Sequence, residues 1–315
     1  MKAISLKESG NVSNFQYVDL PKPIIKEDEV LIKVASLSVN PVDCKARANE
    51  GTLSWLFGSD RPVILGWDLS GTIEEVGSEV TNFDINDAVY GMVNFPGIGN
   101  AYAEYVAVPS SHLALKPTSI SHQEAAAATL AALTAWQTLV TNGNIKKGNK
   151  VLIHGASGGV GHYATQIAKH FGCYVIGTSS KKNKDFVLQN GTDLHIDYTK
   201  VDFEDVVSEV DFVLDTIGGI TMDKSIKITR NGGTIITIPS GNIPQEYLDK
   251  AKAQNVSLSF LLVKSSGNDM KIIADLMEKG VLKSHISKQF SFDKMADSHL
   301  QLETGRTVGK LVVNI

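Results

Sequence analysis

A glycine-dense turn between two regular segments constrains this chain most. Residues 151–153 form a β-branched apolar run that predicts a strand, and residues 162–170 predict a helix. The turn between them reads His154-Gly-Ala-Ser-Gly-Gly-Val-Gly161. Glycines let backbone N–H groups approach a diphosphate without a Cβ in the way, and a helix start adds the positive end of its dipole. The turn therefore indicates dinucleotide binding, although Ala156 replaces the usual first glycine.

The same turn also fits a serine hydrolase. Residues 155–159 satisfy the pattern G-x-S-x-G, which places a nucleophile, here Ser157, on a strand–turn–helix elbow. Asp215 and then His285 or His299 follow in the order that such a triad requires. The turn alone leaves both functions open.

Composition narrows the class of protein. The 315 residues suit two domains, and a net charge of −4 argues against a dedicated nucleic-acid binder. The sequence has no apolar run of about 18 residues, so no membrane partner is expected. The N-terminus predicts a strand instead of a signal segment, and Cys44 and Cys173 are too few for a disulfide framework. We expect a cytoplasmic protein.

Periodicity divides the chain in two. The first part has short strands at 30–34, 71–76 and 103–108 between turn clusters, which predicts a β-rich module in the form of a partly closed barrel. Ser121 and Glu124 form a capping box before an alanine-rich helix at 125–136. Strands and helices then alternate, which indicates a parallel sheet: strands at 151–153, 174–178, 211–215 and 234–238, helices at 162–170 and 184–189. The expected domains are 1–120, completed by 275–315, and 121–274.

Two features favour the dinucleotide site over the hydrolase. Gly161 continues the glycine pattern where a dinucleotide fold needs close helix–strand packing. The end of the second strand, at 178–183, carries hydroxyls and cations but no carboxylate to hold a ribose 2′-OH. Such groups suit a 2′-phosphate, so NADP is expected in preference to NAD.

Short motifs along the whole chain resemble one family. They are Asn40-Pro-Val-Asp-Cys-Lys-Ala-Arg47, Leu65-Gly-Trp-Asp-Leu-Ser-Gly71, Phe83-Asp-Ile-Asn-Asp-Ala-Val-Tyr-Gly91, Leu133-Thr-Ala-Trp136, Ile196-Asp-Tyr198, Asp215-Thr-Ile-Gly-Gly219 and Gly309-Lys-Leu-Val-Val313. In this order they resemble a zinc-independent member of the medium-chain dehydrogenase/reductase superfamily, in its quinone oxidoreductase and enone (2-alkenal) reductase branch. In the third motif Asn86 replaces the family's glycine.

The resemblance implies an α/β fold in which a GroES-like, β-rich catalytic domain accompanies a Rossmann domain with a doubly wound parallel sheet and bound NADPH. Segments 238–240 and 260–263 would meet the nicotinamide amide, and the edge strand at 255–260 would pair two copies into a homodimer. Lys181 or Lys182 would lie near the 2′-phosphate. The residues assigned to the cofactor are Ser157, Gly158, Gly159, Val160, Ser179, Ser180, Asn183, Tyr198 and Lys310.

The resemblance also shapes the expected chemistry. Asn40 and Trp67 stand where zinc-dependent relatives have a cysteine and a histidine ligand, so no metal is expected. Without a Lewis acid, hydride transfer from NADPH to a conjugated enone or a quinone is the natural reaction. Lys45 is the candidate for stabilising the developing oxyanion, and Asn40 for positioning the ribose or the substrate carbonyl.

Other polar residues are expected to be structural. Asp43 and Asp68 would pair with backbone or with Arg47, and Cys44 would be a small buried filler. His154 and His162 would make local hydrogen bonds.

Three points stay open in the sequence. The acceptor is either a quinone or an alkene conjugated to a carbonyl, and the segments 49–57, 95–100 and 261–267 would select it. A non-catalytic NADPH-binding sensor or scaffold is an alternative function, and a hydrolase that uses Ser157 is a weaker one.

Overall fold

The computed structural model describes all of residues 1–315, and these divide into two compact units. Unit 1 comprises Met1–Leu133 and Val263–Ile315, and unit 2 comprises Thr134–Leu262. No helix is both long and apolar enough to cross a membrane.

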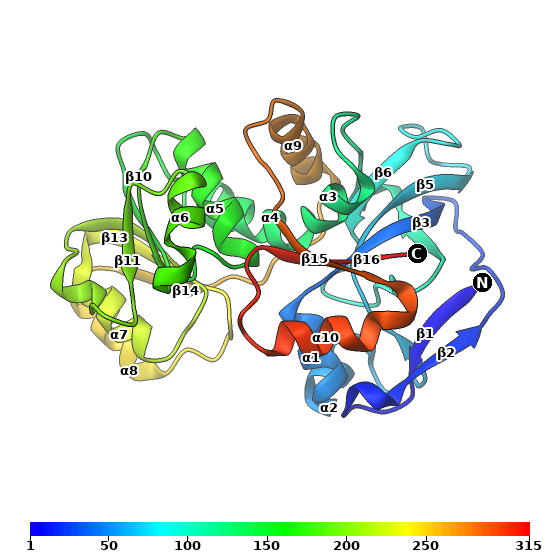
Figure 1. The fold of residues 1–315 in the computed structure, drawn as a ribbon, viewed down its shortest axis with the longest axis horizontal. Helices are drawn as coiled ribbons and strands as arrows, with labels where there is room; N and C mark the ends of the chain where they lie inside the picture. The colour runs from blue at the N-terminus through cyan, green and yellow to red at the C-terminus, as the bar shows by residue number, and fades with distance from the viewer. The chain divides into compact units, whose positions relative to one another are not determined.

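Unit 1 is built on a mostly antiparallel seven-stranded sheet in the order β15-β16-β3-β5-β6-β8, with β7 also paired to β3 (Figure 1). The C-terminal strand β16 pairs with β3, so the chain returns to its first module as the sequence indicates. A smaller sheet has the order β2-β1-β4. The strands are β1 (Lys2–Leu6), β2 (Phe15–Asp19), β3 (Glu29–Val39), β4 (Val63–Ile64), β5 (Asp68–Val76), β6 (Ala88–Met92), β7 (Tyr105–Pro109), β8 (Leu113–Leu115), β15 (Ile286–Ser291) and β16 (Lys310–Asn314).

Short helices connect the strands of unit 1. These helices are α1 (Pro41–Ala48), α2 (Glu50–Phe57), α3 (His122–Ala127), α9 (Gly267–Glu278) and α10 (Met295–Glu303), with 3-10 turns η1 (Val12–Asn14), η2 (Ser110–His112) and η6 (Phe292–Lys294). The predicted capping box opens α3: Glu124 N donates to Ser121 Oγ at 3.2 Å, and Ser121 N donates to Glu124 Oε2 at 2.8 Å.

The single helix expected at 125–136 is two helices. After α3 the chain breaks and restarts as α4 (Leu130–Trp136), which spans the border of the two units and continues into a π-helical turn η3 (Gln137–Asn142). Leu130 N donates to Asp68 Oδ1 at 3.0 Å, so a carboxylate from β5 lies at the start of α4. A negative charge there is favourable because the first N–H groups of a helix have no partner within it.

The two units meet in the sequence after Leu133 and after Leu262, whereas the expected borders are at 120 and 274. Helix α3 packs against β3, β5 and β16, and α9 packs against β8, so both belong to unit 1. Sequence periodicity locates a helix but does not tell which sheet its apolar face covers.

Unit 2 contains a six-stranded sheet in the order β11-β10-β9-β12-β13-β14, in which every pairing is parallel (Figure 1). The order runs outward from β9 in both directions, and right-handed crossovers then put helices on both faces. This is the predicted doubly wound α/β fold. Its elements are β9 (Lys150–Ile153), α5 (Gly159–His170), β10 (Tyr174–Ser179), η4 (Lys181–Asn183), α6 (Lys184–Gln189), β11 (Leu194–Asp197), η5 (Phe203–Asp205), β12 (Val210–Asp215), α7 (Ile220–Ile228), β13 (Thr229–Thr237), α8 (Gln245–Ala253) and β14 (Ser257–Phe260).

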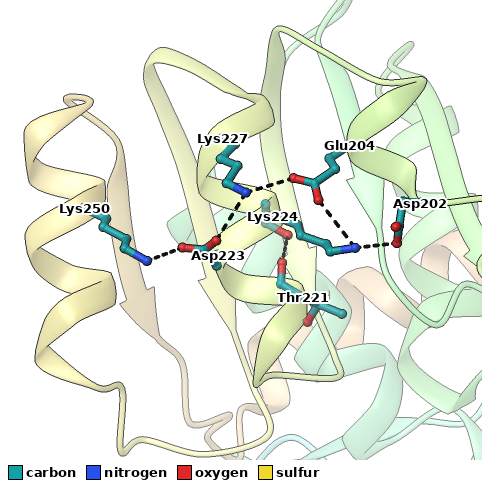
Figure 2. Close-up of polar contacts among 8 residues, drawn as sticks. Asp202, Glu204, Thr221, Asp223, Lys224, Lys227 and Lys250 are labelled. Carbon is teal, nitrogen blue, oxygen red and sulfur yellow. Dashed lines mark hydrogen bonds and ion pairs between the residues drawn. The ribbon is translucent and has the colours of Figure 1, made fainter.

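One face of this sheet carries α7 and α8, and ion pairs link these helices on their exposed side (Figure 2). Asp223 of α7 accepts from Lys250 of α8 and lies 3.5 Å from Lys227. Lys227 in turn lies 3.2 Å from Glu204 in η5, which is also 3.5 Å from Lys224. The network therefore joins three elements that are separated in sequence.

Candidate functional site

The turn after β9 requires glycine at two positions. Gly155 has φ of 63°, and a Cβ there would lie 2.7 Å from Thr216 Oγ1. A Cβ on Gly161 would lie 2.2 Å from Gly155 O, closer than real Cβ atoms come to another atom. The glycine pattern therefore brings the first turn of α5 against the preceding loop, as the dinucleotide interpretation requires.

The start of α5 is open to an anion. The helix begins at Gly159, three residues before the predicted start, so the loop glycines are part of its first turn. Gly158 occupies the N-cap position and supplies no capping side chain, and the first turn holds no acidic residue. The first N–H groups of a helix, here those of Gly159 and Val160, have no partner within it. These residues fit a diphosphate, which would accept from the backbone N–H groups.

Ser157, Asp215 and His299, three members of the proposed hydrolase triad, make polar contacts with other groups. Ser157 Oγ accepts from Asn183 Nδ2 at 3.1 Å. The Asp215 carboxylate accepts from the N–H groups of Ile217 and Gly218 and from two threonine hydroxyls. His299 lies in unit 1, where its Nε2 is 2.9 Å from the Tyr102 hydroxyl.

The end of β10 gathers most of the residues predicted to hold the 2′-phosphate. Ser179 is 2% exposed, and its hydroxyl lies 3.2 Å from Ser180 O. Ser180 and Asn183 are half-buried, whereas the side chain of Tyr198 is 63% exposed. The amide of Asn183 contacts Ser157, and this contact links the end of β10 to the phosphate loop. Lys181 and Lys182 in η4 are exposed.

Two residues at this edge are missed by sequence reasoning. His195 Nε2 lies 2.8 Å from Ser179 Oγ, and Asp197 pairs in register with Ser179. Both come from β11, about one helix later in the chain. The rule that places a selectivity residue at the end of the second strand does not reach the neighbouring strand. The motif Ile196-Asp-Tyr198 was the signal in the sequence that could have pointed to this part of β11.

The segments assigned to the nicotinamide end follow two other strands of the same sheet. Ile238 N donates to Asp215 O at 3.0 Å, and Leu261 N donates to Thr237 O at 3.0 Å. Both segments thus leave the carboxyl ends of β13 and β14. In a parallel sheet these ends lie on the edge that also carries the turn after β9.

Of the two histidines that flank the glycine turn, His162 makes the predicted local hydrogen bond, whereas His154 contacts residues of other elements. His154 contacts Thr178 Oγ1 at 3.3 Å and Ser225 Oγ at 3.0 Å, and its burial lowers the pKa to about 4. His162 Nδ1 lies 3.0 Å from Gly158 O.

Unit 1 contains a buried polar cluster around Asn40, which is 1% exposed. Asn40 Nδ2 donates to Asp68 Oδ2 at 2.7 Å, and Asn40 Oδ1 accepts from the Lys310 ammonium. Lys310 Nζ also donates to Val39 O at 3.2 Å and lies 3.9 Å from Asp68 Oδ2. Burial lowers the pKa of Lys310 and raises that of Asp68, while the attraction between the two charges opposes both shifts.

Asp43 belongs to the same cluster. Asp43 Oδ2 accepts from Asn40 N at 2.7 Å, while Asp43 Oδ1 is buried without a hydrogen-bond partner. Burial, and then the Asp68 charge, raise the pKa of Asp43 to about 7. Asp43 and Asp68 thus accept from backbone N–H groups, the first of the two predicted kinds of partner, and Arg47, the second, has other partners. Arg47 instead donates to Gly10 O at 2.6 Å and pairs with Glu303.

The predicted catalytic and cofactor residues of unit 1 lie in different surroundings. Lys45 is exposed on α1, whereas Asn40 precedes that helix and is buried. Lys310, predicted to bind the cofactor, is 3% exposed, and its ammonium points into the polar cluster. Their roles toward cofactor and substrate stay predictions. Cys44 is buried beside His299, and burial raises the pKa of its thiol, as expected for a filler.

The residues at the two zinc-ligand positions do not fit a zinc ion. The Asn40 oxygen accepts from Lys310, and the only nitrogen of Trp67 donates to Gly97 O at 2.7 Å. Trp67 also packs against Phe57 and Phe95, with ring centroids 5.8 and 5.4 Å away. An aromatic cluster stands in place of the metal ligand.

Comparison with known proteins identifies the family. Residues 26–118 match the family model "Alcohol dehydrogenase GroES-like domain", and residues 190–313 match the model "Zinc-binding dehydrogenase". A 2-methylene-furan-3-one reductase from Solanum lycopersicum is 35% identical over 100% of this chain and 79% of its own length. The chain belongs to the medium-chain dehydrogenase/reductase superfamily.

Two further members of the superfamily resemble the chain over nearly its whole length. The NADPH-dependent alkenal/one oxidoreductase of Arabidopsis thaliana is 34% identical over 99% of this chain and 79% of its own length. The solved quinone oxidoreductase from Coxiella burnetii is 34% identical with a TM-score of 0.93, over 100% of this chain and 99% of that one. The whole GroES-like match lies in unit 1, and the Rossmann sheet is that of unit 2.

Proposed function

We propose that this medium-chain dehydrogenase/reductase is an enzyme that uses NADPH to reduce a carbonyl-conjugated acceptor, either an α,β-unsaturated ketone or aldehyde or a quinone. The observation that carries the proposal is the open start of α5, where Gly158 leaves the backbone N–H groups uncapped behind a turn that only glycine fits. The names of the tomato, Arabidopsis and Coxiella relatives support this acceptor class.

The reaction needs one hydride and one proton. When bound, NADPH would supply the hydride, with segments 238–240 and 260–263 proposed to hold its nicotinamide amide. An enone that accepts hydride at its β-carbon develops negative charge on the carbonyl oxygen. A hydrogen-bond donor then stabilises the enolate oxygen, and we assign this role to the ammonium of Lys45, which is exposed on α1. Water supplies the proton to the α-carbon. A quinone accepts the hydride and a proton in the same way and yields a hydroquinone.

The proposed preference for NADPH rests on the end of β10. Ser179, Ser180, Asn183, Lys181 and Lys182 supply hydroxyl, amide and ammonium groups where a ribose 2′-phosphate is expected. The Arabidopsis relative is named as NADPH-dependent, which supports the same choice.

Turnover of defined acceptors tests the function. The purified protein is mixed with NADPH and, in separate reactions, with a short alkenal, a cyclic enone and a naphthoquinone. We expect NADPH oxidation, and deuterium at C4 of the cofactor should appear at the β-carbon of the saturated product. Lys45→Met should lower kcat while the NADPH affinity stays unchanged, with Lys33→Met as a control on an exposed lysine of β3.

The outcomes separate the remaining alternatives. Turnover with the naphthoquinone alone would assign a quinone reductase and exclude the enone reaction. Tight NADPH binding without turnover on any acceptor would contradict the enzyme and favour a sensor or scaffold.

Assembly and location are part of the proposal. We infer a homodimer, because β14 ends the order of the Rossmann sheet and offers a free strand edge to a second copy. Light scattering should give about twice the chain mass of 33.9 kDa. A cytoplasmic location is also proposed, and fractionation of the source cells tests it.

A further inference from the structure

His195 lies beside Ser179, one of the residues proposed to hold the 2′-phosphate. It lies on β11 opposite Gly177 of β10, and its Nε2 is 2.8 Å from Ser179 Oγ. Ser179 is buried, and the same oxygen lies 3.2 Å from Ser180 O. The imidazole therefore contacts a buried hydroxyl at the end of β10.

Which of the two groups donates in this hydrogen bond depends on whether His195 Nε2 carries a proton. A serine hydroxyl has one proton to donate. When His195 Nε2 carries no proton, Ser179 donates either to that nitrogen or to Ser180 O. When Nε2 carries a proton, as in one neutral tautomer and always in the imidazolium, Nε2–H donates to Ser179 Oγ, and the hydroxyl proton is left for Ser180 O or an added acceptor. Protonation of His195 thus removes the neutral tautomer in which Ser179 donates to the imidazole, and it keeps the hydroxyl as a donor for an anion.

The charges around His195 come from two elements. Asp197 lies on the same strand, and its carboxylate accepts from Thr199 N at 3.1 Å and Thr199 Oγ1 at 2.7 Å. Lys184 acts on His195 from α6. Burial and Lys184 lower the pKa of His195, while Asp197 raises it, and the net direction is down. The imidazole is therefore mostly neutral near pH 7 before a ligand binds.

We propose that His195 is a positioning residue of the 2′-phosphate subsite, which takes up a proton when the phosphorylated cofactor binds and holds the Ser179 hydroxyl as a donor to the phosphate. This inference rests on the proposed function, because it assumes NADPH in this site. It adds a residue from β11 to a subsite otherwise drawn from β10 and η4.

The sign of proton exchange isolates this role. A phosphate dianion next to His195 favours the imidazolium, so binding of NADPH takes up protons, whereas NADH has no phosphate and does not. The 2′-phosphate itself has a second pKa of about 6, and binding to cations favours its dianion and releases protons. Net proton uptake near pH 7 therefore cannot come from the phosphate.

Calorimetry of the full chain tests the proposal. NADPH and NADH are titrated at pH 6.5, 7.0 and 8.0 in buffers with different ionisation enthalpies, which gives the number of protons exchanged. For the wild type we expect uptake of a fraction of a proton with NADPH, and an affinity that rises up to about threefold per unit of falling pH. With NADH we expect neither effect.

Two substitutions of His195 separate positioning from packing. His195→Gln keeps an amide that can donate to Ser179 but cannot titrate, so it should abolish proton uptake and flatten the pH profile while binding NADPH well at pH 8.0. His195→Leu removes the hydrogen bond and should weaken NADPH about tenfold at every pH, as expected for a lost contact worth about 1.4 kcal/mol. His170→Gln is the matched control, since His170 is exposed at the far end of α5.

Unchanged proton uptake in His195→Gln would overturn the inference while leaving the proposed function intact, provided that the variant still turns over an enone. Equal weakening of NADPH and NADH in both His195 variants would also overturn it, since that pattern indicates a packing role. If the wild type binds no NADPH, the proposed function fails and the inference fails with it.

Discussion

The two units use their polar residues in opposite ways. In unit 1, Asn40, Asp68 and Lys310 are buried and bonded to one another. In unit 2, the start of α5 is uncapped, and Lys182 and Tyr198 are exposed at the same sheet edge. A cluster whose donors and acceptors are already paired stabilises a fold, whereas unpaired donors at a sheet edge are available to a ligand.

This contrast separates stability from binding. Removal of a charge from the buried cluster leaves its partner desolvated and unpaired, which is costly for folding. Removal or reversal of a charge at the open edge changes the affinity for a ligand and has little effect on folding. Lysines of the same chemical type should therefore behave differently in the two units.

The largest effect is expected for Lys310→Met. The substitution leaves Asp68 and Asp43 buried without their cation and should lower the free energy of unfolding by about 3–5 kcal/mol. Urea unfolding measures the loss. The double variant Asp68→Asn with Lys310→Met should regain part of it, because only one of the two buried carboxylates, Asp43, is then left without the cation. Lys182→Met is the control from the open edge and should leave stability unchanged. If Lys310→Met is as stable as the wild type, the buried cluster of unit 1 does not stabilise the fold.

A smaller effect, on binding alone, is expected for Ser180→Asp. A carboxylate beside the 2′-phosphate repels it, and at the dielectric of a protein surface this should weaken NADPH at least about tenfold. The same carboxylate can accept from a ribose 2′-OH, so NADH should gain affinity. Fluorescence titration with both cofactors measures the change, and Ser180→Asn is the neutral control. If Ser180→Asp gains nothing for NADH, the end of β10 is not the ribose site.

The smallest effect is expected in the surface network of unit 2. Asp223→Asn removes the contacts to Lys250 and Lys227 in Figure 2. Exposed ion pairs contribute little, so the Tm should fall by no more than about 2 °C, and less at high salt. Asp205→Asn, at an exposed aspartate outside these ion pairs, is the control for the same change in net charge. A loss as large as that of Lys310→Met would show that exposure does not separate the two kinds of ion pair.

Local signals in the sequence were reliable where neighbouring residues decide the structure. The capping box of Ser121 and Glu124 and the approach of Gly161 to Gly155 involve contacts within a few residues, and the alternation of strands and helices follows from local periodicity. The same local signals did not predict where the alanine-rich helix is interrupted. Asp68 lies far along the chain from Leu130, and its contact with Leu130 N at the break in the alanine-rich helix could not be seen in the local pattern.

By itself, the sequence determined the doubly wound sheet, the phosphate-binding turn and the family, because these depend on short motifs in a set order. Tertiary structure alone decided that Asp68 pairs with Asn40 and Lys310, that Arg47 pairs with Glu303, and that His195 contacts Ser179. Each of these pairs joins separate elements, and the partner of a buried charge is set by sheet register and packing, which no local pattern encodes.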